Sequence, residues 1–128
     1  MIFERAFALF VILTTLPFTA AQAEPPPSAR AEIDYLLLYI QTAGCSFYRN
    51  GTWYDGPRAK EHLKSKYDYL AERNQIGAAE DFIDKAATKS SMSGNPYKIR
   101  CANSGEVESG PWLRQVLLHH RASDRPTR

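Results

Sequence analysis

The sequence predicts an α+β fold, with three to four helices packed on a small antiparallel sheet and one disulfide. Three observations support this prediction. Apolar residues recur at helical spacing in several segments, Asn50-Gly51 separates two runs of strand-forming residues, and the chain has two cysteines, Cys45 and Cys101.

The first helix is predicted over residues 29–43, because apolar residues recur there three and four positions apart. Ser28 is expected to cap its N-terminus, and Gly44 is expected to end it. Apolar residues also occur on its other sides, which is typical of a central, buried helix. The recurring positions are Ile33, Leu36, Leu37 and Ile40.

A β-hairpin is predicted over residues 47–54, with the sequence FYRNGTWY. Asn50-Gly51 suits a type I′ turn, because that turn needs a positive φ at both central residues. The aromatic and β-branched residues on either side favour strands. Asn50-Gly51-Thr52 also matches the N-glycosylation pattern, but the geometry of the turn already accounts for the Asn-Gly pair.

Two further helices are predicted after the hairpin. One begins at Asp55-Gly56-Pro57 and extends to about Glu72. The next has Glu80 and Asp81 at its N-terminal end, where acidic residues favour a helix. Their apolar stripes are Ala59, Leu63, Tyr67 and Leu70 in the first, and Ala79, Phe82, Ile83, Ala86 and Ala87 in the second.

The C-terminal part is predicted to contain a polar loop over residues 89–96 and a half-buried strand over 97–101. A short return strand is expected around Val107. A last helix is expected to start at Pro111. Its apolar side would carry Trp112, Leu113, Val116, Leu117 and His120.

The N-terminus is predicted to be a cleavable signal peptide over residues 1–23. Its apolar run is too short to span a bilayer, and Ala21-Gln22-Ala23 has small residues at the positions that a signal peptidase recognises. The mature protein is therefore expected in the periplasm, without a membrane anchor. It is expected to comprise an extended Pro-rich leader over 24–28, one globular domain over 29–122 and a disordered tail over 123–128.

Cys45 and Cys101 are predicted to form a structural disulfide, because the exported chain enters an oxidising compartment. Their spacing fits neither a CxxC redox motif nor a metal site. The bridge closes a long loop and contributes about 4 kcal/mol in the chain-entropy model. It would place strand 97–101 beside residues 46–49.

The net charge is +2, and it stays so after residues 1–23 are removed, because these include one basic residue, Arg5, and one acidic residue, Glu4. So small and mixed a charge argues against nucleic acid or an anionic membrane as a partner. The domain is expected to be a monomer. The arginines near the C-terminus are interpreted as part of a frayed, soluble end; they are Arg121, Arg125 and Arg128.

Four stretches cover nearly the whole mature chain in a specific order: CSFYRNGTWYDG, AKEHLKSKYDYL, AEDFIDKAATKSSMSGNPYKIRC and WLRQVLLHHR. This pattern resembles a bacterial family known as domain of unknown function 5329. The resemblance implies a small exported, periplasmic protein. It implies no activity, so the function has to be argued from the residues.

Eight polar residues are candidates for a binding site, if the disulfide gathers their elements around one shallow pocket. Cationic and hydroxyl groups in such a pocket suit a carboxylate, a phosphate or a sugar. The sequence has no spacing typical of a metal site, and no cofactor is expected. The candidates are Arg49, Tyr54, His62, Lys66, Ser90, Ser91, Ser93 and Tyr97.

Each candidate also has a structural interpretation. Arg49 can lie over Trp53 or pair with Asp55. Lys66 can extend along the tyrosines that follow it on the same helix. His62 can be a hydrogen-bonded structural histidine, and the three serines can satisfy free backbone groups at a helix end.

The favoured function is a non-catalytic binding or envelope-associated module for an unidentified periplasmic ligand or protein. One alternative is a lysozyme inhibitor, because Ser93-Gly94-Asn95-Pro96-Tyr97 is similar to the short loop of several periplasmic lysozyme inhibitors. A second is a small hydrolase in which His62 acts as the base for a loop serine, oriented by Glu61 or Asp81. The chain has no G-x-S-x-G motif, and no catalytic residue is assigned.

Overall fold

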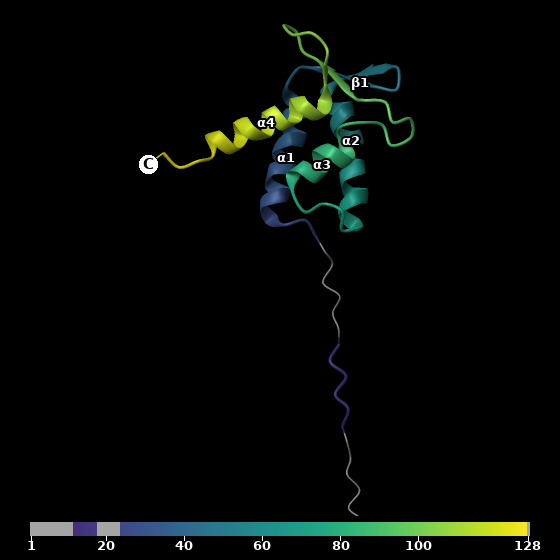
Figure 1. The fold of residues 1–128 in the computed structure, drawn as a ribbon, viewed down its shortest axis with the longest axis vertical. Helices are drawn as coiled ribbons and strands as arrows, with labels where there is room; N and C mark the ends of the chain where they lie inside the picture. Colours follow the sequence, from purple (N-terminus) through teal and green to yellow (C-terminus); the bar gives the residue numbers. More distant parts are fainter. Residues whose placement is uncertain (1–11, 18–23, 128) are drawn as a thin grey trace, which may run out of the picture.

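The computed structural model describes residues 12–17 and 24–127. The predicted signal peptide over residues 1–23 lies outside this part of the chain, except for 12–17, which form neither helix nor strand. The described residues form four helices and a four-stranded antiparallel sheet, which confirms the α+β fold (Figure 1). None of the helices within these ranges combines the length and the apolar character needed to cross a membrane.

The first helix, α1 (Pro27–Thr42), begins earlier than the sequence predicts. Proline suits the first turn, because its φ is already helical and its missing N–H leaves no unpaired donor. Ser28 therefore lies inside the first turn, and the expectation that it caps the helix is wrong. Gly44 follows the helix with a φ of +71° and ends it as predicted.

The second helix, α2 (Gly56–Glu72), is capped by Asp55, which accepts a hydrogen bond of 2.9 Å from the backbone N–H of Arg58. Gly56 lets this helix pack closely on the end of α1. A β-carbon at Gly56 would lie 2.5 Å from the carbonyl oxygen of Ile40, so only glycine leaves room. The contact holds the N-terminal half of α2 against the core.

The third helix, α3 (Ala79–Ala86), forms over the predicted apolar series. Asp81 accepts hydrogen bonds from the backbone N–H groups of Gly77 and Ala78, and its negative charge lies at the positive end of the helix. The apolar positions of the series are all buried: Ala79, Phe82, Ile83, Ala86 and Ala87.

The sheet has the strand order β2-β1-β3-β4. Asn50 and Gly51 have φ values of 47° and 89°, as a type I′ turn requires, so the predicted hairpin is confirmed. The expected return strand around Val107 is present and pairs with β3. The strands are β1 (Ser46–Arg49), β2 (Thr52–Tyr54), β3 (Lys98–Arg100) and β4 (Val107–Glu108).

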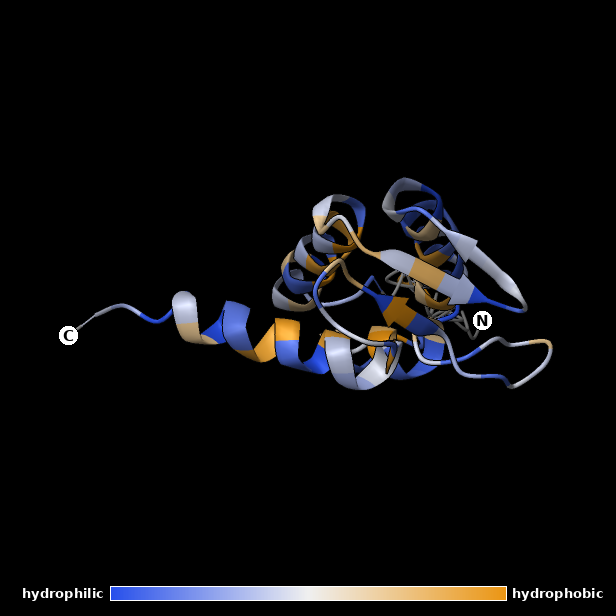
Figure 2. Cartoon of the chain, turned by 90° about the horizontal axis from the view of Figure 1, so that it is seen from above, coloured by the Kyte–Doolittle hydropathy of each residue, from blue (hydrophilic) through white to orange (hydrophobic). Residues whose placement is uncertain are grey.

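The predicted disulfide between Cys45 and Cys101 joins the ends of β1 and β3. Ser46 pairs with Arg100 in the next position of the ladder, so the covalent bridge and the strand pairing reinforce each other. Figures 1 and 2 show the sheet lying across one end of α1 and α2. One side of the sheet therefore faces the helices.

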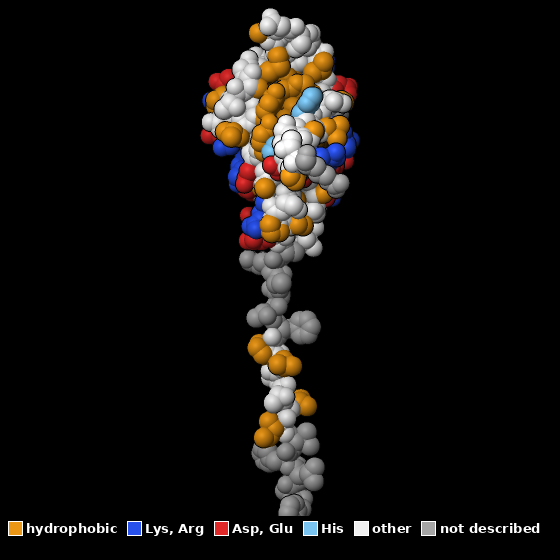
Figure 3. All heavy atoms as spheres, turned by 90° about the vertical axis from the view of Figure 1, so that its left-hand side faces the viewer, with side chains coloured by type: hydrophobic (Ala, Val, Ile, Leu, Met, Phe, Trp, Pro, Cys, Tyr) orange, Lys and Arg blue, Asp and Glu red, His pale blue; other side chains and the backbone are white. Residues whose placement is uncertain are grey.

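The last helix, α4 (Ser109–Ser123), begins two residues before Pro111 and runs crosswise to α1 (Figure 1). His120 stacks on Tyr35 of α1, with ring centroids 3.8 Å apart. Figure 3 shows apolar side chains gathered on the face at the left of Figure 1, where α1 and α4 lie. The expected apolar side of α4 is buried at Leu113, Val116 and Leu117.

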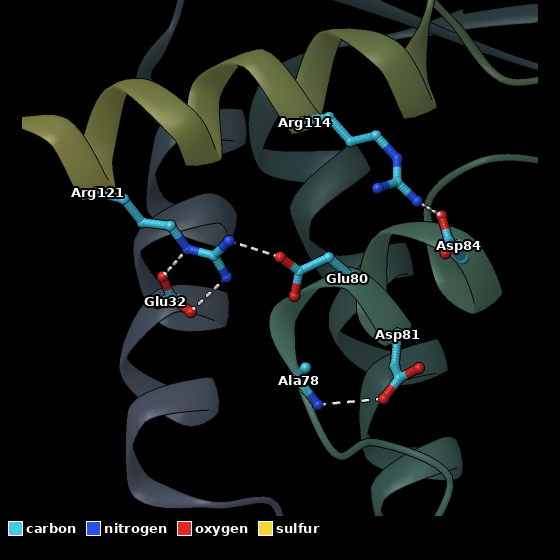
Figure 4. Close-up of polar contacts among 7 residues, drawn as sticks. All are labelled: Glu32, Ala78, Glu80, Asp81, Asp84, Arg114 and Arg121. Atoms are coloured by element: carbon cyan, nitrogen blue, oxygen red, sulfur yellow. Dashed lines mark hydrogen bonds and ion pairs between the residues drawn. The ribbon is translucent and has the colours of Figure 1, made fainter.

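Arg121 connects three helices, so its assignment to a frayed chain end is wrong (Figure 4). Its Nε donates to Glu32 of α1 at 2.6 Å, and its Nη1 donates to Glu80 of α3 at 2.6 Å. These hydrogen bonds lower the pKa of both carboxyl groups. Arg114 forms a second ion pair between α4 and Asp84 of α3.

Candidate functional site

The candidate residues of the hairpin face those of α2. Phe47 is buried in the core, and Arg49 lies on the same side of β1, because side chains alternate along a strand. Tyr54 pairs with Phe47 across the hairpin and shares that side. On α2, His62 and Lys66 lie one turn apart on one side of the helix.

Four candidates form a hydrogen-bonded group that we call the donor cluster: Arg49, His62, Lys66 and Tyr97. Arg49 Nη1 lies 2.7 Å from His62 Nδ1, and His62 Nε2 lies 3.1 Å from the hydroxyl oxygen of Tyr97. Lys66 Nζ donates to the same hydroxyl at 3.1 Å and to a backbone carbonyl of the following loop at 3.1 Å. Tyr54 lies at the edge, where its hydroxyl accepts from Arg49 at 3.4 Å.

The donor cluster has more protons to donate than acceptors to receive them. A guanidinium group only donates, and Arg49 Nη1 lies 2.7 Å from His62 Nδ1 and 3.2 Å from Nε2, so we assign the acceptor role to the nearer Nδ1 and the ring proton to Nε2. His62 Nε2 and Lys66 Nζ then both donate to the hydroxyl oxygen of Tyr97. With this tautomer, the hydroxyl proton of Tyr97 has no acceptor among the described residues and is available to a ligand.

The donor cluster is also electropositive. In the described ranges, neither Arg49 nor Lys66 forms an ion pair with a carboxylate. Burial lowers the pKa of His62 to about 4, and the charges of Arg49 and Lys66 act in the same direction. Burial also lowers the pKa of Lys66, with a further contribution from Arg49. His62 is therefore neutral at pH 7, beside two cations without a counter-ion.

A pocket of about 590 Å³ opens between the hairpin and α2 beside the donor cluster. Its lining includes Arg49, His62 and Tyr97, together with the exposed Arg58 of α2. A second pocket of about 310 Å³ adjoins the first, and both are lined by His62 and Ser65. The larger volume falls within the range of small-molecule sites, about 300–1,000 Å³.

The three candidate serines have different surroundings. Asn50 donates to Ser90 Oγ at 3.1 Å, and Ser93 Oγ donates to Asn50 Oδ1 at 2.8 Å. Ser90 and Ser93 thus hold the turn of the hairpin and are not hydrogen-bonded to the donor cluster. Ser91 lines the second pocket. Ser90 is buried, whereas residues 91–96 of the loop are exposed, and Met92 is 97% exposed.

The aromatic rings that Arg49 and Lys66 contact are not the ones that the structural interpretations named. Arg49 lies over the ring of Tyr54, 5.0 Å from its centroid, whereas another arginine covers Trp53. Asp55 forms no ion pair with Arg49, because its carboxylate caps α2. Lys66 lies over the ring of Tyr97, 5.0 Å from its centroid, and not along the tyrosines that follow it on α2.

The surroundings of His62 differ from those of a catalytic base. Both of its ring nitrogens are engaged, by Arg49 and by Tyr97, and its hydrogen bonds within the described residues include no serine and no carboxylate. Asp81 is held at the N-terminus of α3. The described residues also contain no group of three or more His, Cys, Asp or Glu side chains that could hold a metal ion.

Several residues that line the pockets were missed by the sequence analysis, among them Arg58, Ser65, Tyr69 and Lys85. Arg58, Ser65 and Tyr69 share the face of α2 that carries His62. They lie four, three and seven residues from His62, and this helical spacing could have identified them from the sequence. Lys85 belongs to α3, and only the packing of α3 on α2 brings it to the second pocket. No local pattern indicates that contact.

Comparison with known proteins places the chain in a family. A family model described as "Family of unknown function (DUF5329)" matches residues 27–121. The chain belongs to this family. A relative from Salmonella typhimurium strain LT2, called "Uncharacterized protein YfeK", is 37% identical over 91 residues, which cover 70% of this chain and 72% of the relative. No solved structure matches the chain. The resemblance found in the sequence is confirmed. Membership of DUF5329 assigns no activity to the chain, because the function of the family is unknown.

Proposed function

We propose that this DUF5329 protein is a non-catalytic binding protein that holds a carboxylate or a phosphate in the pocket between the hairpin and α2. The observation that carries the proposal is the convergence of His62 and Lys66 on the hydroxyl of Tyr97, beside Arg49 and with no carboxylate paired to either cation among the described residues. An acceptor at this point would complete the hydrogen bonds of the cluster, and a negative charge would balance its cations. A carboxylate or a phosphate supplies both.

The rim of the pocket supports the same ligand chemistry. The hydroxyl of Tyr54 accepts from Arg49, and this hydrogen bond lowers the pKa of Tyr54. Arg58 adds an exposed positive charge to the lining, which includes Glu61 as its acidic member. Donors and cations therefore outnumber acceptors around the whole opening.

Export to the periplasm is part of this proposal. The predicted signal peptide over residues 1–23 supports it, because such a segment directs the chain out of the cytoplasm. The disulfide between Cys45 and Cys101 supports it as well, because structural disulfides persist in oxidising compartments. A periplasmic binding protein would meet anionic cell-wall fragments and metabolites.

The two alternative functions have weaker support. A hydrolase would need His62 to accept a proton from a serine, but the accepting nitrogen of His62 already receives a hydrogen bond from Arg49. A lysozyme inhibitor is favoured by the exposure of Ser93 and Gly94. However, Ser93 already donates its hydroxyl proton to Asn50, and this bond would have to break before the serine could reach a partner's carboxylate.

The experiment that tests the proposal is an NMR titration of the disulfide-bonded protein with acetate and with inorganic phosphate, at pH 7 and constant ionic strength. We expect saturable shifts of the amide signals of Arg49, His62 and Tyr97. Arg49→Gln should weaken binding by about tenfold or more, because it removes a charge-assisted donor. Its fold should be retained, since Arg49 is only half-buried.

Arg100→Gln is the matched control. Arg100 is also a strand arginine above an aromatic ring, but it pairs with Ser46 and therefore lies on the other side of the sheet from Arg49. This variant should bind both anions like the wild type. Shifts that do not saturate, or equal affinities for Arg49→Gln and the wild type, would refute the proposal.

A further inference from the structure

The two pockets form one elongated site along α2. They meet at His62 and Ser65, which line both. The exposed side chain of Ser65 lies between them and is too small to separate them. A ligand in the first pocket can therefore extend toward the second along the side chains of His62 and Ser65.

Five of the α2 residues that line the two pockets share one face of the helix, and the first pocket is lined by further residues of α2 on its other sides, Ala59, Lys60, Glu61, Leu63 and Lys64. At 100° per residue, Arg58, His62, Ser65, Lys66 and Tyr69 fall within an arc of about 100°. Arg58 and Tyr69 are eleven residues apart, which corresponds to about 16 Å along the axis at about 1.5 Å per residue. This length exceeds the size of a single carboxylate or phosphate.

The second pocket has positive charges of its own. Lys66 and Lys85 line it, and its lining contains no carboxylate. Lys85 Nζ donates to the backbone carbonyl of Gln75 at 2.8 Å and lies 3.9 Å from Asp81, which is outside the lining. The ammonium group keeps further protons for a ligand.

The floor of the second pocket is apolar. Leu70 is half-buried in it, and the ring of Tyr69 is 56% exposed beside it. Arg73 covers one face of this ring, 3.5 Å from its centroid. An apolar or ring-shaped spacer would find contact area here, between the donor cluster at one end and Lys85 at the other.

We infer that the ligand of this protein is an elongated molecule with two acidic groups joined by an apolar or ring-shaped spacer. One acidic group occupies the donor cluster at Tyr97, and the second lies between Lys85 and Ser91 in the adjoining pocket. The inference rests on the anion-binding function proposed above. It goes further by naming the class of ligand, a linear dianion, and the residues that determine which ligand length binds best.

The length of the spacer follows from the helix. The second acidic group lies one to two turns beyond His62, so the two groups are expected to be about 6–10 Å apart. Very short dianions would leave the second pocket empty. Single anions would make half of the contacts. Affinity should therefore pass through a maximum as the spacer grows.

A series of linear dicarboxylates from malonate to sebacate tests the inference by isothermal titration calorimetry and NMR, with acetate as the single anion. Malonate has the same charge as the longer members, but its two carboxylates are too close together to occupy both pockets. It is therefore the charge-matched control. We expect the best member of intermediate length to bind about tenfold more tightly than malonate or acetate.

Two variants locate the second acidic group. Lys85→Met should remove the preference for intermediate length and leave acetate binding unchanged, because Lys85 does not belong to the donor cluster. Ser91→Asp should have the same selective effect, through repulsion at the far end of the site. Lys98→Met, on the outer side of the sheet, is the matched control and should behave like the wild type. Circular dichroism of each variant verifies its fold.

The outcomes separate the inference from the function on which it rests. If acetate and phosphate bind at the donor cluster but all dicarboxylates bind equally, the second subsite is wrong and the anion-binding function stands. The same holds if the optimum persists in both Lys85→Met and Ser91→Asp. If no anion binds at all, the proposed function is wrong, and the inference is wrong with it.

Discussion

Lowering the pH from 7 to 5 is expected to destabilise the protein through His62. Burial lowers the pKa of His62 to about 4, together with the charges of Arg49 and Lys66, whereas an unfolded histidine titrates near about 6.5. Between these values the unfolded chain takes up a proton that the folded chain does not, so stability rises with pH in this window. Full linkage gives about 2 kcal/mol between pH 7 and 5; since the ring is only partly buried, we expect about 1 kcal/mol.

The assay is urea unfolding of the wild type and of His62→Gln at both pH values. Glutamine keeps an acceptor for Arg49 and a donor for Tyr97, but it does not titrate. The variant should therefore lose about 1 kcal/mol less than the wild type between pH 7 and 5. An equal loss in both proteins would refute a lowered pKa of His62.

The carboxyl groups do not interfere with this comparison. Hydrogen bonds from Arg121 lower the pKa of Glu32 and Glu80, and those from the Gly77 and Ala78 backbone N–H groups lower the pKa of Asp81. Their contribution to stability is present above the unfolded pKa of about 4 and is lost as the pH falls below it. They also titrate in both proteins, so their effect cancels in the difference.

Three further predictions concern the scaffold and are measured by urea or thermal unfolding under oxidising conditions. Cys45→Ser should lower the free energy of unfolding by about 4 kcal/mol, and an unchanged melting temperature would exclude a stabilising bridge. Gly56→Ala should cost about 2 kcal/mol or more, because its β-carbon meets the backbone of α1. Gly105→Ala, where a β-carbon meets nothing within 4 Å, should cost much less, and equal losses would contradict the close contact. Arg121→Met should lower the free energy of unfolding by about 1 kcal/mol, because it leaves the carboxylates of Glu32 and Glu80 unpaired. Arg114→Met, which breaks a single exposed ion pair, is the control. If both variants lose the same stability, the ion pairs of Arg121 contribute no more than an ordinary surface pair.

Much of the fold could be predicted because its signals are local. Asn50-Gly51 specifies its own turn through backbone geometry, and the apolar series of α3 specifies both the helix and its buried face. Cys45 and Cys101 then provide one long-range constraint, which correctly places β3 beside β1. The start of α1 was missed because proline at the first turn is a weaker signal than a serine cap.

The candidate site could be predicted only in part. The sequence proposed that Arg49, His62 and Lys66 converge, and the structure brings them together at Tyr97. It could not show that Tyr97 is a shared acceptor, because that depends on side-chain positions across separations of 31 and 35 residues. Lys85 reaches the site through helix packing, which leaves no local trace in the sequence.

The most direct test of anion binding at the donor cluster is the pKa of His62 with and without an anion. The ring protons of His62 would be followed by NMR between about pH 7 and pH 3, in chloride and in sulfate of equal ionic strength. Sulfate is a suitable probe because it has the shape of phosphate and keeps its charge over this range. A negative charge bound beside Arg49 and Lys66 would offset the cations that help to keep this pKa low, so we expect it to rise from about 4 by about one unit or more. An identical pKa in both solutions would contradict the claim that the donor cluster binds an anion.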